Sequence, residues 1–256
     1  MMEDYLKPFL KKGKAMFLAY DHGFEHGPKD LMGKSLDPEY ILDLAVKGGY
    51  TGIILQKGIA EKYYTGTKYQ RQIPLILKIN GKTNLCSQEE PYSAINCRVE
   101  YAQQLGAQAV GYTIYLGSEK ETKMFEDFGR IQEEAHRLNM AAIAWIYPRG
   151  KAVLNETSSE ITQYAARVGL ELGADLIKIK YPGSEEAMKE AIKAAGKTKV
   201  VLSGGPKIEE EEFLDEIKKV IKAGVIGVAV GRNVWQRDNA LEITEKIKKI
   251  IFLNSL

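Results

Sequence analysis

The chain has 256 residues, of which 45% are hydrophobic and 27% are charged. These values are typical of a globular protein, and no apolar run approaches the roughly 18 residues that a membrane-spanning helix needs, so composition excludes disorder and membrane insertion. The 36 lysines and arginines nearly balance the 34 aspartates and glutamates, which leaves a formal net charge of +2. This balance argues against a nucleic-acid or membrane-surface partner and requires that any anion site be local.

The N-terminal sequence and the cysteine count indicate a cytoplasmic protein. The first twenty residues lack the long apolar core and the small-residue cleavage site of a signal peptide. The two cysteines, Cys86 and Cys97, are too few for a disulfide framework, and neither has the partner spacing of a metal site. We expect a reduced protein in which each cysteine is a small apolar residue or an incidental thiol.

Short β-rich runs alternate along the chain with longer segments whose apolar residues follow helical spacing. These runs predict eight strands, over residues 15–21, 52–56, 74–80, 109–115, 141–147, 176–181, 199–204 and 227–232. The segments between them predict helices over residues 38–48, 118–138, 159–173, 184–196, 208–223 and 238–252.

The helix ends support the same order of elements. Asp37 and Ser158 each stand where a helix begins, and Gly106, Gly173 and Gly224 each stop a helix just before a buried strand. No linker or shift in composition divides the chain. Eight βα units in this length predict an α/β fold with a single domain over residues 1–256, the (β/α)8 or TIM barrel. A doubly wound sheet usually stops at about five to seven strands.

In such a barrel the loops that follow the strands build the active site, so polar residues at strand ends are the candidates. The first strand runs into a loop that holds Asp21, His22, Glu25 and His26. Asp21 is suited to proton transfer and the histidines to contacts with substrate oxygens. Two alternatives remain open, a glycine-rich turn whose polar groups satisfy the backbone and a metal site made by His22, Glu25 and His26.

The sixth predicted strand carries two lysines on one face. Alternation places Ile177 and Ile179 toward the helices and Lys178 and Lys180 toward the barrel interior. Burial and mutual repulsion disfavour the charged amine, and a neutral amine attacks a carbonyl to form a Schiff base, an electron sink for C–C chemistry. Spacing does not distinguish the two lysines. Lysines that extend to the mouth or pair with carboxylates are the structural alternative.

Other strand ends add a phenol and further cations. Tyr147 shares a face with Trp145, and if it points inward it lies beside the lysines and can relay a proton; a core tyrosine bonded to the backbone is the alternative. The third strand supplies Lys78. The last two strands end in Ser203-Gly204-Gly205 and Gly231-Arg232-Asn233, which predict a phosphate site, although glycine also closes ordinary turns.

Several long motifs follow one another along nearly the whole chain: LAYDHGFEHGP, GIAEKYY, PLILKINGKT, GYTIY, MFEDFGRI, WIYPRG, ELGADLIKIKYPG, VLSGGPK and GVAVGRNVWQR. In this order and spacing the chain resembles the archaeal-type class I fructose-1,6-bisphosphate aldolases. The resemblance implies a (β/α)8 barrel and Schiff-base chemistry without a metal or another cofactor. It also implies a homo-oligomer built from pentameric rings, such as a decamer.

The resemblance further implies roles for single residues. Lys178 matches the imine-forming lysine and Tyr147 the proton donor and acceptor, with Asp21 and Trp145 as active-site partners. It implies a phosphate clamp at Ser203, Gly204, Gly205, Gly231 and Arg232, and a pocket completed by His22, His26, Lys78, Arg149 and Lys180. One departure is TGTKYQRQ, residues 65–72, which is longer and more basic than the family's loop and leaves that edge of the site undefined.

The implied reaction is the reversible cleavage of fructose 1,6-bisphosphate to dihydroxyacetone phosphate and glyceraldehyde 3-phosphate, in glycolysis or gluconeogenesis. A sister group performs a transaldol reaction that leads to an aminodideoxyheptulosonate, but it is not expected to have Trp145 or Lys180, so the aldolase is favoured. An aldolase for another phosphorylated sugar and a non-catalytic phosphate-binding barrel remain alternatives. We expect the cations at one rim (Lys78, Arg149, Lys178, Lys180 and Arg232) and the balancing acidic residues on the outer helices.

Overall fold

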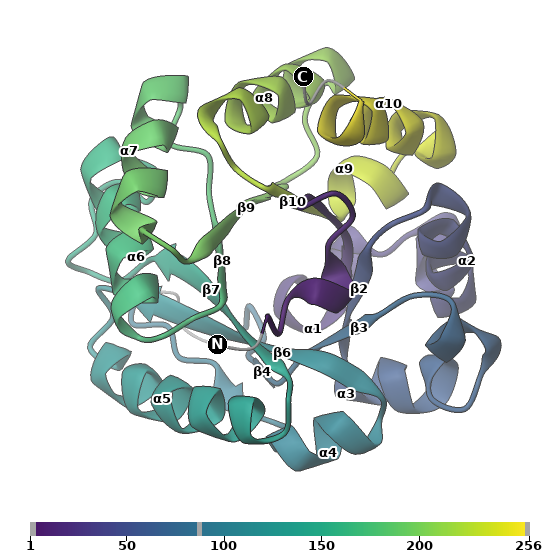
Figure 1. Ribbon diagram of the computed structural model, residues 1–256, viewed down its shortest axis with the longest axis horizontal. Helices are drawn as coiled ribbons and strands as arrows, with labels where there is room; N and C mark the ends of the chain where they lie inside the picture. Colours follow the sequence, from purple (N-terminus) through teal and green to yellow (C-terminus); the bar gives the residue numbers. More distant parts are fainter. Residues whose placement is uncertain (1–3, 86–88, 254–256) are drawn as a thin grey trace.

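Eight parallel strands close into a barrel in the computed structural model, which describes residues 4–85 and 89–253 (Figure 1). The strands follow one another around the barrel in the order β1-β2-β3-β6-β7-β8-β9-β10, and β10 pairs with β1. Their bounds are β1 (Ala15–Tyr20), β2 (Gly52–Gln56), β3 (Leu75–Lys78), β6 (Ala107–Leu116), β7 (Ala141–Pro148), β8 (Leu176–Ile179), β9 (Lys199–Ser203) and β10 (Gly227–Val230). The predicted barrel and the place of all eight strands are confirmed.

Helices surround the barrel where the sequence predicts them (Figure 1). They are α2 (Pro38–Gly48), α5 (Glu121–Arg137), α6 (Ser159–Glu171), α7 (Glu185–Ala195), α8 (Glu210–Ala223) and α10 (Ala240–Phe252), with the shorter α4 (Val99–Gln104) ahead of β6. Asp37 Oδ1 accepts a hydrogen bond from Glu39 N at 2.9 Å, and Ser158 Oγ accepts one from Ile161 N at 3.3 Å, so both predicted caps form. Gly224 ends α8 with a φ of 110°.

Short elements that the sequence did not predict fill the loops. They are α1 (His22–His26), α3 (Lys57–Ile59), the π-helical turn Ala60–Tyr64, α9 (Arg232–Trp235), the antiparallel pair β4 (Asn80–Gly81) and β5 (Ala94–Ile95), and the 3₁₀ helices Lys7–Phe9, Pro28–Asp30, Gly33–Leu36 and Lys68–Arg71. One turn of helix or two residues of strand shows no hydrophobic period, so pattern analysis does not detect such elements.

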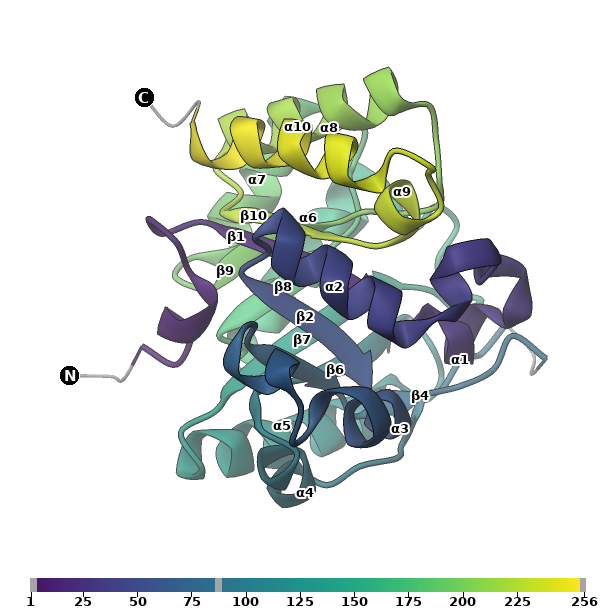
Figure 2. The ribbon, with the colours of Figure 1, turned by 90° about the vertical axis from the view of Figure 1, so that its right-hand side faces the viewer.

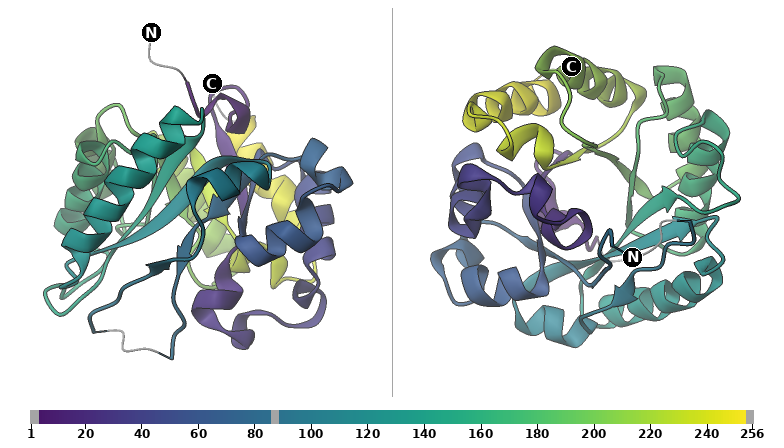
Figure 3. Two further views of the ribbon diagram at one scale, coloured as in Figure 1. Left: turned by 90° about the horizontal axis from the view of Figure 1, so that it is seen from below. Right: turned by 180° about the vertical axis from the view of Figure 1, so that it is seen from behind.

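The side-chain alternation predicted for the strands separates two apolar layers. The barrel interior holds alternate strand residues such as Phe17, Ile76 and Leu176, and the layer between strands and helices holds Ile177 and Ile179. The N-terminal segment closes one end of the interior, where Leu6 and Phe9 pack against these residues. Figures 1 and 2 show this segment at one end of the barrel, and the right panel of Figure 3 shows α1 over the opposite end.

The basic stretch over residues 65–72 lies away from that second end, which contains the candidate site. Thr65 Oγ1 donates to Leu105 O at 2.9 Å, and Gln70 packs against Gly106, just before β6 begins. Tyr69 is buried and its hydroxyl donates to Asp43 Oδ1 at 2.8 Å, on α2. The expectation that this stretch borders the site is therefore wrong, because it precedes β3 and so lies at the N-terminal ends of the strands.

Two remaining features bear on the environment of the chain. No helix in residues 4–85 and 89–253 has the length and apolar character needed to cross a membrane. Cys97 is a buried free thiol, consistent with the prediction of a small apolar residue, and Cys86 lies outside the described residues.

Gly111 on β6 makes room for the indole of Trp145 inside the barrel. A Cβ atom at Gly111 would lie 1.8 Å from two ring carbons of Trp145. We expect Gly111→Ala to lower the free energy of unfolding by about 1–3 kcal/mol, because the buried ring must move. Urea unfolding measures the change. The matched control is Gly129→Ala on α5, where nothing lies within 4 Å, and a gain of about 0.5–1 kcal/mol is expected. Equal stability of Gly111→Ala and the wild type would contradict this packing.

Candidate active site

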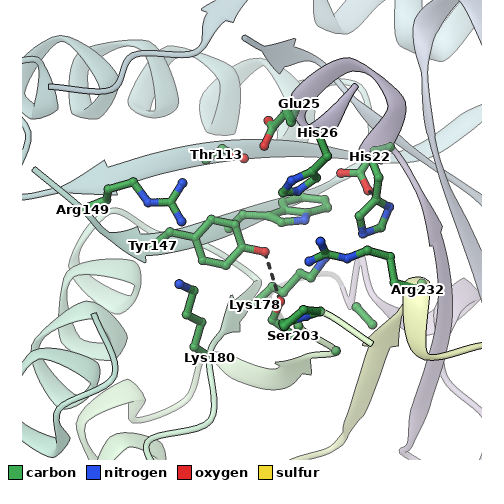
Figure 4. Close-up of a pocket in the computed structure, with 17 residues that line it drawn as sticks. His22, Glu25, His26, Thr113, Tyr147, Arg149, Lys178, Lys180, Ser203 and Arg232 are labelled. Carbon is green, nitrogen blue, oxygen red and sulfur yellow. Dashed lines mark hydrogen bonds and ion pairs between the residues drawn. The ribbon is translucent and has the colours of Figure 1, made fainter. Parts of the chain in front are cut away.

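A pocket opens at the C-terminal ends of the barrel strands (Figure 4). Its lining comes from the loop after β1 and from the ends of β6, β7, β8, β9 and β10. The predicted site residues among the lining are Asp21, His22, His26, Trp145, Tyr147, Arg149, Lys178, Lys180, Ser203, Gly204, Gly205, Gly231 and Arg232. The fold therefore brings together residues that are more than two hundred positions apart in the sequence, such as Asp21 and Arg232. Lys78 is the predicted site residue that does not line the pocket.

Lys178 reaches the pocket from inside the barrel. It lies on β8, is 5% exposed, and its Nζ lies 5.4 Å from the centre of the Trp145 ring. Burial lowers the pKa of Lys178, the nearby carboxylate of Asp21 opposes this shift, and the positive charge of Arg232 adds to it. The lower pKa increases the fraction of neutral, nucleophilic amine at a given pH.

Lys180 differs from Lys178 in place and in partner. It follows the last residue of β8, is 30% exposed, and its Nζ donates to the carboxylate of Glu156. The expectation that both lysines point into the barrel interior is wrong for Lys180, which lines the mouth. The strand ends before it, so its long side chain stays partly hydrated and paired. The charge that lowers the pKa of Lys178 comes from Arg232 rather than from Lys180.

Asp21 and His22 stand beside Lys178 at the end of β1. Burial alone would raise the pKa of Asp21, but the positive charges of Lys178 and Lys78 outweigh it and hold the pKa below the usual value. Burial lowers the pKa of His22 to about 3, so its imidazole is neutral at pH 7. The site thus holds a carboxylate and a neutral imidazole next to the amine.

The two histidines of this loop stack rather than converge. The His22 and His26 rings lie 5.7 Å apart at an interplanar angle of 29°, and His22 also meets the Trp235 ring edge-on at 5.5 Å. Within residues 4–85 and 89–253, no three His, Cys, Asp or Glu side chains are grouped as ligands for a metal ion. The loop itself forms α1, so it is a helical turn rather than an extended glycine-rich loop.

The phenol of Tyr147 points into the pocket. Its hydroxyl lies 3.3 Å from Ser203 Oγ, a contact that Figure 4 marks with a dashed line. Tyr147 follows Trp145 on the same face of β7, and Trp145 pairs with Lys178 on β8. Burial raises the pKa of Tyr147, so the hydroxyl keeps its proton at neutral pH. The hydrogen-bond partner of Tyr147 is therefore a side chain of the pocket lining, and not a backbone group as in the core-tyrosine alternative.

The loops after β9 and β10 form one wall of the pocket, and Asn233 joins them. Asn233 Nδ2 donates to Gly204 O at 2.7 Å and to Pro206 O at 2.6 Å. A Cβ atom at Gly231 would lie 2.7 Å from Ala19 O, and Gly205 has a φ of 63°, so glycine is needed at both positions. Small residues leave the backbone accessible to an anion, as the sequence predicts for a phosphate site.

Lys78 contacts a residue of the pocket lining but does not line the pocket itself. It is 1% exposed, and its Nζ donates to Glu25 Oε1 at 3.1 Å and to Asn80 O at 2.8 Å. Glu25 lines the pocket from α1, so the ion pair attaches this helical turn to β3. The structure therefore places Lys78 behind the pocket wall, where it acts on the site through its charge and through Glu25.

Carboxylates accompany the cations at this rim. Lys78 pairs with Glu25, both Arg149 and Lys180 pair with Glu156, and Arg232 Nη1 lies 3.1 Å from Asp30 Oδ2. The sequence analysis expected the balancing acidic residues on the outer helices, but these three carboxylates lie at the rim itself. Sequence reasoning missed Glu156, Asp30, Thr113 and the linking role of Asn233. Thr113 lies within β6, and the other three lie in the segments that follow β7, β1 and β10.

Comparison with known proteins identifies the family. Residues 15–237 match the DeoC/LacD family aldolase model. The chain belongs to this family.

Archaeal relatives of this DeoC/LacD-family chain agree with the resemblance seen in the sequence. It is 51% identical to the class 1 fructose-bisphosphate aldolase of Thermoproteus tenax, over 98% of this chain and 95% of that protein. The class 1 fructose-bisphosphate aldolase of Halobacterium salinarum is 44% identical, over 96% and 93% of the two chains. A solved archaeal fructose-1,6-bisphosphate aldolase, whose catalytic lysine is covalently bound to the carbinolamine intermediate of the substrate, matches with a TM-score of 0.93, 51% identity and 98% coverage of both chains.

Proposed function

We propose that this protein is a class I fructose-bisphosphate aldolase, which reversibly cleaves fructose 1,6-bisphosphate to dihydroxyacetone phosphate and glyceraldehyde 3-phosphate. The observation that carries the proposal is the buried amine of Lys178, whose pKa is lowered, at the base of a pocket rimmed by cations. A neutral amine in this position is suited to a Schiff base. The archaeal relatives, which carry this name over nearly the whole chain, support it.

In this reaction Lys178 Nζ attacks C2 of the ketose and forms a carbinolamine. Proton transfer assisted by Asp21 and Tyr147 removes the C2 oxygen as water and leaves an iminium ion. Tyr147, which has given its proton to the leaving water, accepts the proton of the C4 hydroxyl while the C3–C4 electron pair moves to the iminium, which releases glyceraldehyde 3-phosphate and leaves an enamine. Tyr147, whose raised pKa keeps it protonated, donates a proton to C3. Hydrolysis of the new iminium then frees dihydroxyacetone phosphate and restores the amine.

Two cationic ends of the pocket suit the two phosphates of the substrate. In Figure 4, Arg232 lies on one side of Lys178 and Tyr147, and Arg149 and Lys180 lie on the other. The phosphate on C1 is adjacent to the carbon that Lys178 attacks, and Arg232 is the cation whose charge acts on Lys178. The C1 phosphate therefore binds at Arg232 and the glycine-rich loops, and the C6 phosphate binds at Arg149 and Lys180.

Three further properties rest on the sequence and on the resemblance to the archaeal aldolases. We propose that residues 1–256 form one domain, that the protein is cytoplasmic, and that it assembles into a homo-oligomer of pentameric rings, such as a decamer. The closed barrel, which uses strands from near both ends of the chain, supports the first. Analytical ultracentrifugation tests the last through the mass of the assembly.

Cleavage of fructose 1,6-bisphosphate in the presence of EDTA tests the proposed function. We expect full activity, because the amine of Lys178 supplies the electron sink that a metal ion provides in other aldolases. A coupled dehydrogenase assay for dihydroxyacetone phosphate measures it. Loss of activity in EDTA, restored by a divalent cation, would support the metal-site interpretation of His22 and His26. Turnover of a different sugar phosphate, with none of fructose 1,6-bisphosphate, would reassign the substrate.

A further inference from the structure

Glu156 joins the two cations at one end of the pocket. Its Oε1 lies 3.1 Å from Arg149 Nε and its Oε2 lies 3.2 Å from Arg149 Nη2, and Lys180 Nζ also donates to Oε2. Arg149 directly follows β7 and Lys180 directly follows β8, whereas Glu156 belongs to the loop between β7 and α6. One carboxylate therefore connects the ends of two neighbouring strands.

Glu156 approaches both cations from outside the pocket. Arg149 and Lys180 line the pocket, but Glu156 lines a neighbouring cavity, which it shares with Arg149 and Lys151. A guanidinium has five N–H donors and an ammonium has three, so the contacts with Glu156 use only part of them. The remaining donors are available to an anion inside the pocket. Glu156 thus orients the cations without occupying the place of a phosphate.

The rest of the Arg149 side chain is also held in place. Its backbone N–H donates to Leu116 O at 2.8 Å, and its guanidinium lies 5.5 Å from the centre of the Tyr115 ring. Lys180, by contrast, is a flexible side chain at the rim, and the charge of Arg149 repels it. The carboxylate of Glu156 offsets this repulsion, so Arg149, Lys180 and Glu156 together carry a net charge of +1.

The charge of Glu156 is present at neutral pH. Burial would raise the pKa of Glu156, but the hydrogen bonds from Arg149 and Lys180 lower it below its usual range. Glu156 is 34% exposed, so salt and water weaken this ion pair but do not remove it.

Resting on the aldolase function above, we propose that Glu156 is a positioning residue, which holds Arg149 and Lys180 as the binding site for the C6 phosphate. It thereby determines the preference for a ketose with two phosphates over one that carries phosphate at C1 alone. The C1 end of the pocket, at Ser203 to Gly205 and Arg232, does not depend on it.

The test compares two substrates in the variant Glu156→Gln, which removes the charge but keeps the length of the side chain. For fructose 1,6-bisphosphate we expect KM to rise about tenfold or more, because roughly one charge-assisted hydrogen bond to the substrate is lost. We expect kcat to change less than about threefold. For fructose 1-phosphate, kcat/KM should stay at the wild-type value. Borohydride trapping with dihydroxyacetone phosphate, which occupies only the C1 end, should also be unchanged.

A second variant separates positioning from charge alone. Glu156→Asp keeps the charge but is one methylene shorter and cannot span both cations, so we expect it to raise KM for fructose 1,6-bisphosphate as well. The matched control is Glu160→Gln, an exposed carboxylate at the start of α6, which should change none of these values.

Two outcomes would overturn the proposal for Glu156, and a third would contradict the aldolase function. An unchanged or lower KM for fructose 1,6-bisphosphate in Glu156→Gln would overturn the proposal, because a carboxylate that merely competes with phosphate tightens binding when removed. An equal loss with both substrates would also overturn it. Failure of the wild-type protein to cleave either substrate would contradict the aldolase function itself and is seen before any variant is measured.

Discussion

Borohydride added with dihydroxyacetone phosphate will fix a covalent adduct on the peptide that carries Lys178. The amine is buried and its pKa is lowered, so a reducible imine forms at pH values where an ordinary lysine is protonated. Peptide mapping by mass spectrometry identifies the modified lysine. We expect Lys178→Ala to abolish the adduct and to reduce turnover by on the order of 10⁴-fold or more, because the nucleophile itself is lost.

Lys180→Ala is the matched control for this experiment. Lys180 lies two residues away but pairs with Glu156 at the mouth, so its removal should leave the adduct with dihydroxyacetone phosphate intact. The trapping rate should rise with pH through the pKa of Lys178 and level off below the pH expected for an exposed lysine, because burial favours the neutral form. An adduct on Lys180, or none at all, would refute the assignment. In the absence of any adduct, ion pairing would be the role of Lys178 in a non-catalytic phosphate-binding barrel.

Tyr147→Phe is expected to slow turnover by roughly 10²–10⁴-fold, the usual contribution of a positioned proton donor. The phenyl ring preserves the packing on β7, so the loss comes from the hydroxyl that lies 3.3 Å from Ser203 Oγ. Steady-state cleavage of fructose 1,6-bisphosphate measures the effect. The variant should still form the reducible adduct with dihydroxyacetone phosphate, because the amine remains, although it will form more slowly.

The control for Tyr147 is Tyr115→Phe on the neighbouring strand β6. The Tyr115 hydroxyl lies 3.3 Å from Ser93 Oγ, and the residue is buried outside the pocket lining. Loss of the Tyr115 hydroxyl should change turnover by less than about threefold, since this hydroxyl transfers no proton in the reaction. Near-normal turnover of Tyr147→Phe would return Tyr147 to the role of a core aromatic residue and require another proton donor.

The local periodicity of the sequence was sufficient to predict the barrel and the face of each strand on which a side chain lies. Strands and helices of useful length carry their own period, so the eight strands and the faces of Ile177 and Lys178 follow from alternation. Glycines that end helices, such as Gly224, can also be predicted from the sequence, because they act through their own backbone conformation. Turns of three to five residues, including α1 and α9, have no such period and were not predicted.

The long motifs of the sequence also indicated the candidate site, because active-site residues of a barrel gather at strand ends. They did not show which carboxylate faces which cation. Glu156 is separated from Lys180 by 24 positions and Asp30 from Arg232 by 202, and no local pattern connects such pairs. The sequence therefore placed the cations at the rim but not their partners.

The amino-acid sequence alone was enough to predict the eight βα units, the inward face of Lys178 and the family, because these depend on residues close together in the chain or on long motifs. It left open whether Tyr147 points inward. The folded structure was needed to show that Lys178 is buried while Lys180 lies at the mouth, that Lys78 stands behind the pocket, and that residues 65–72 lie at the other end of the barrel. Burial and ion pairing depend on where a strand ends and on what closes over it, and those are properties of the folded chain.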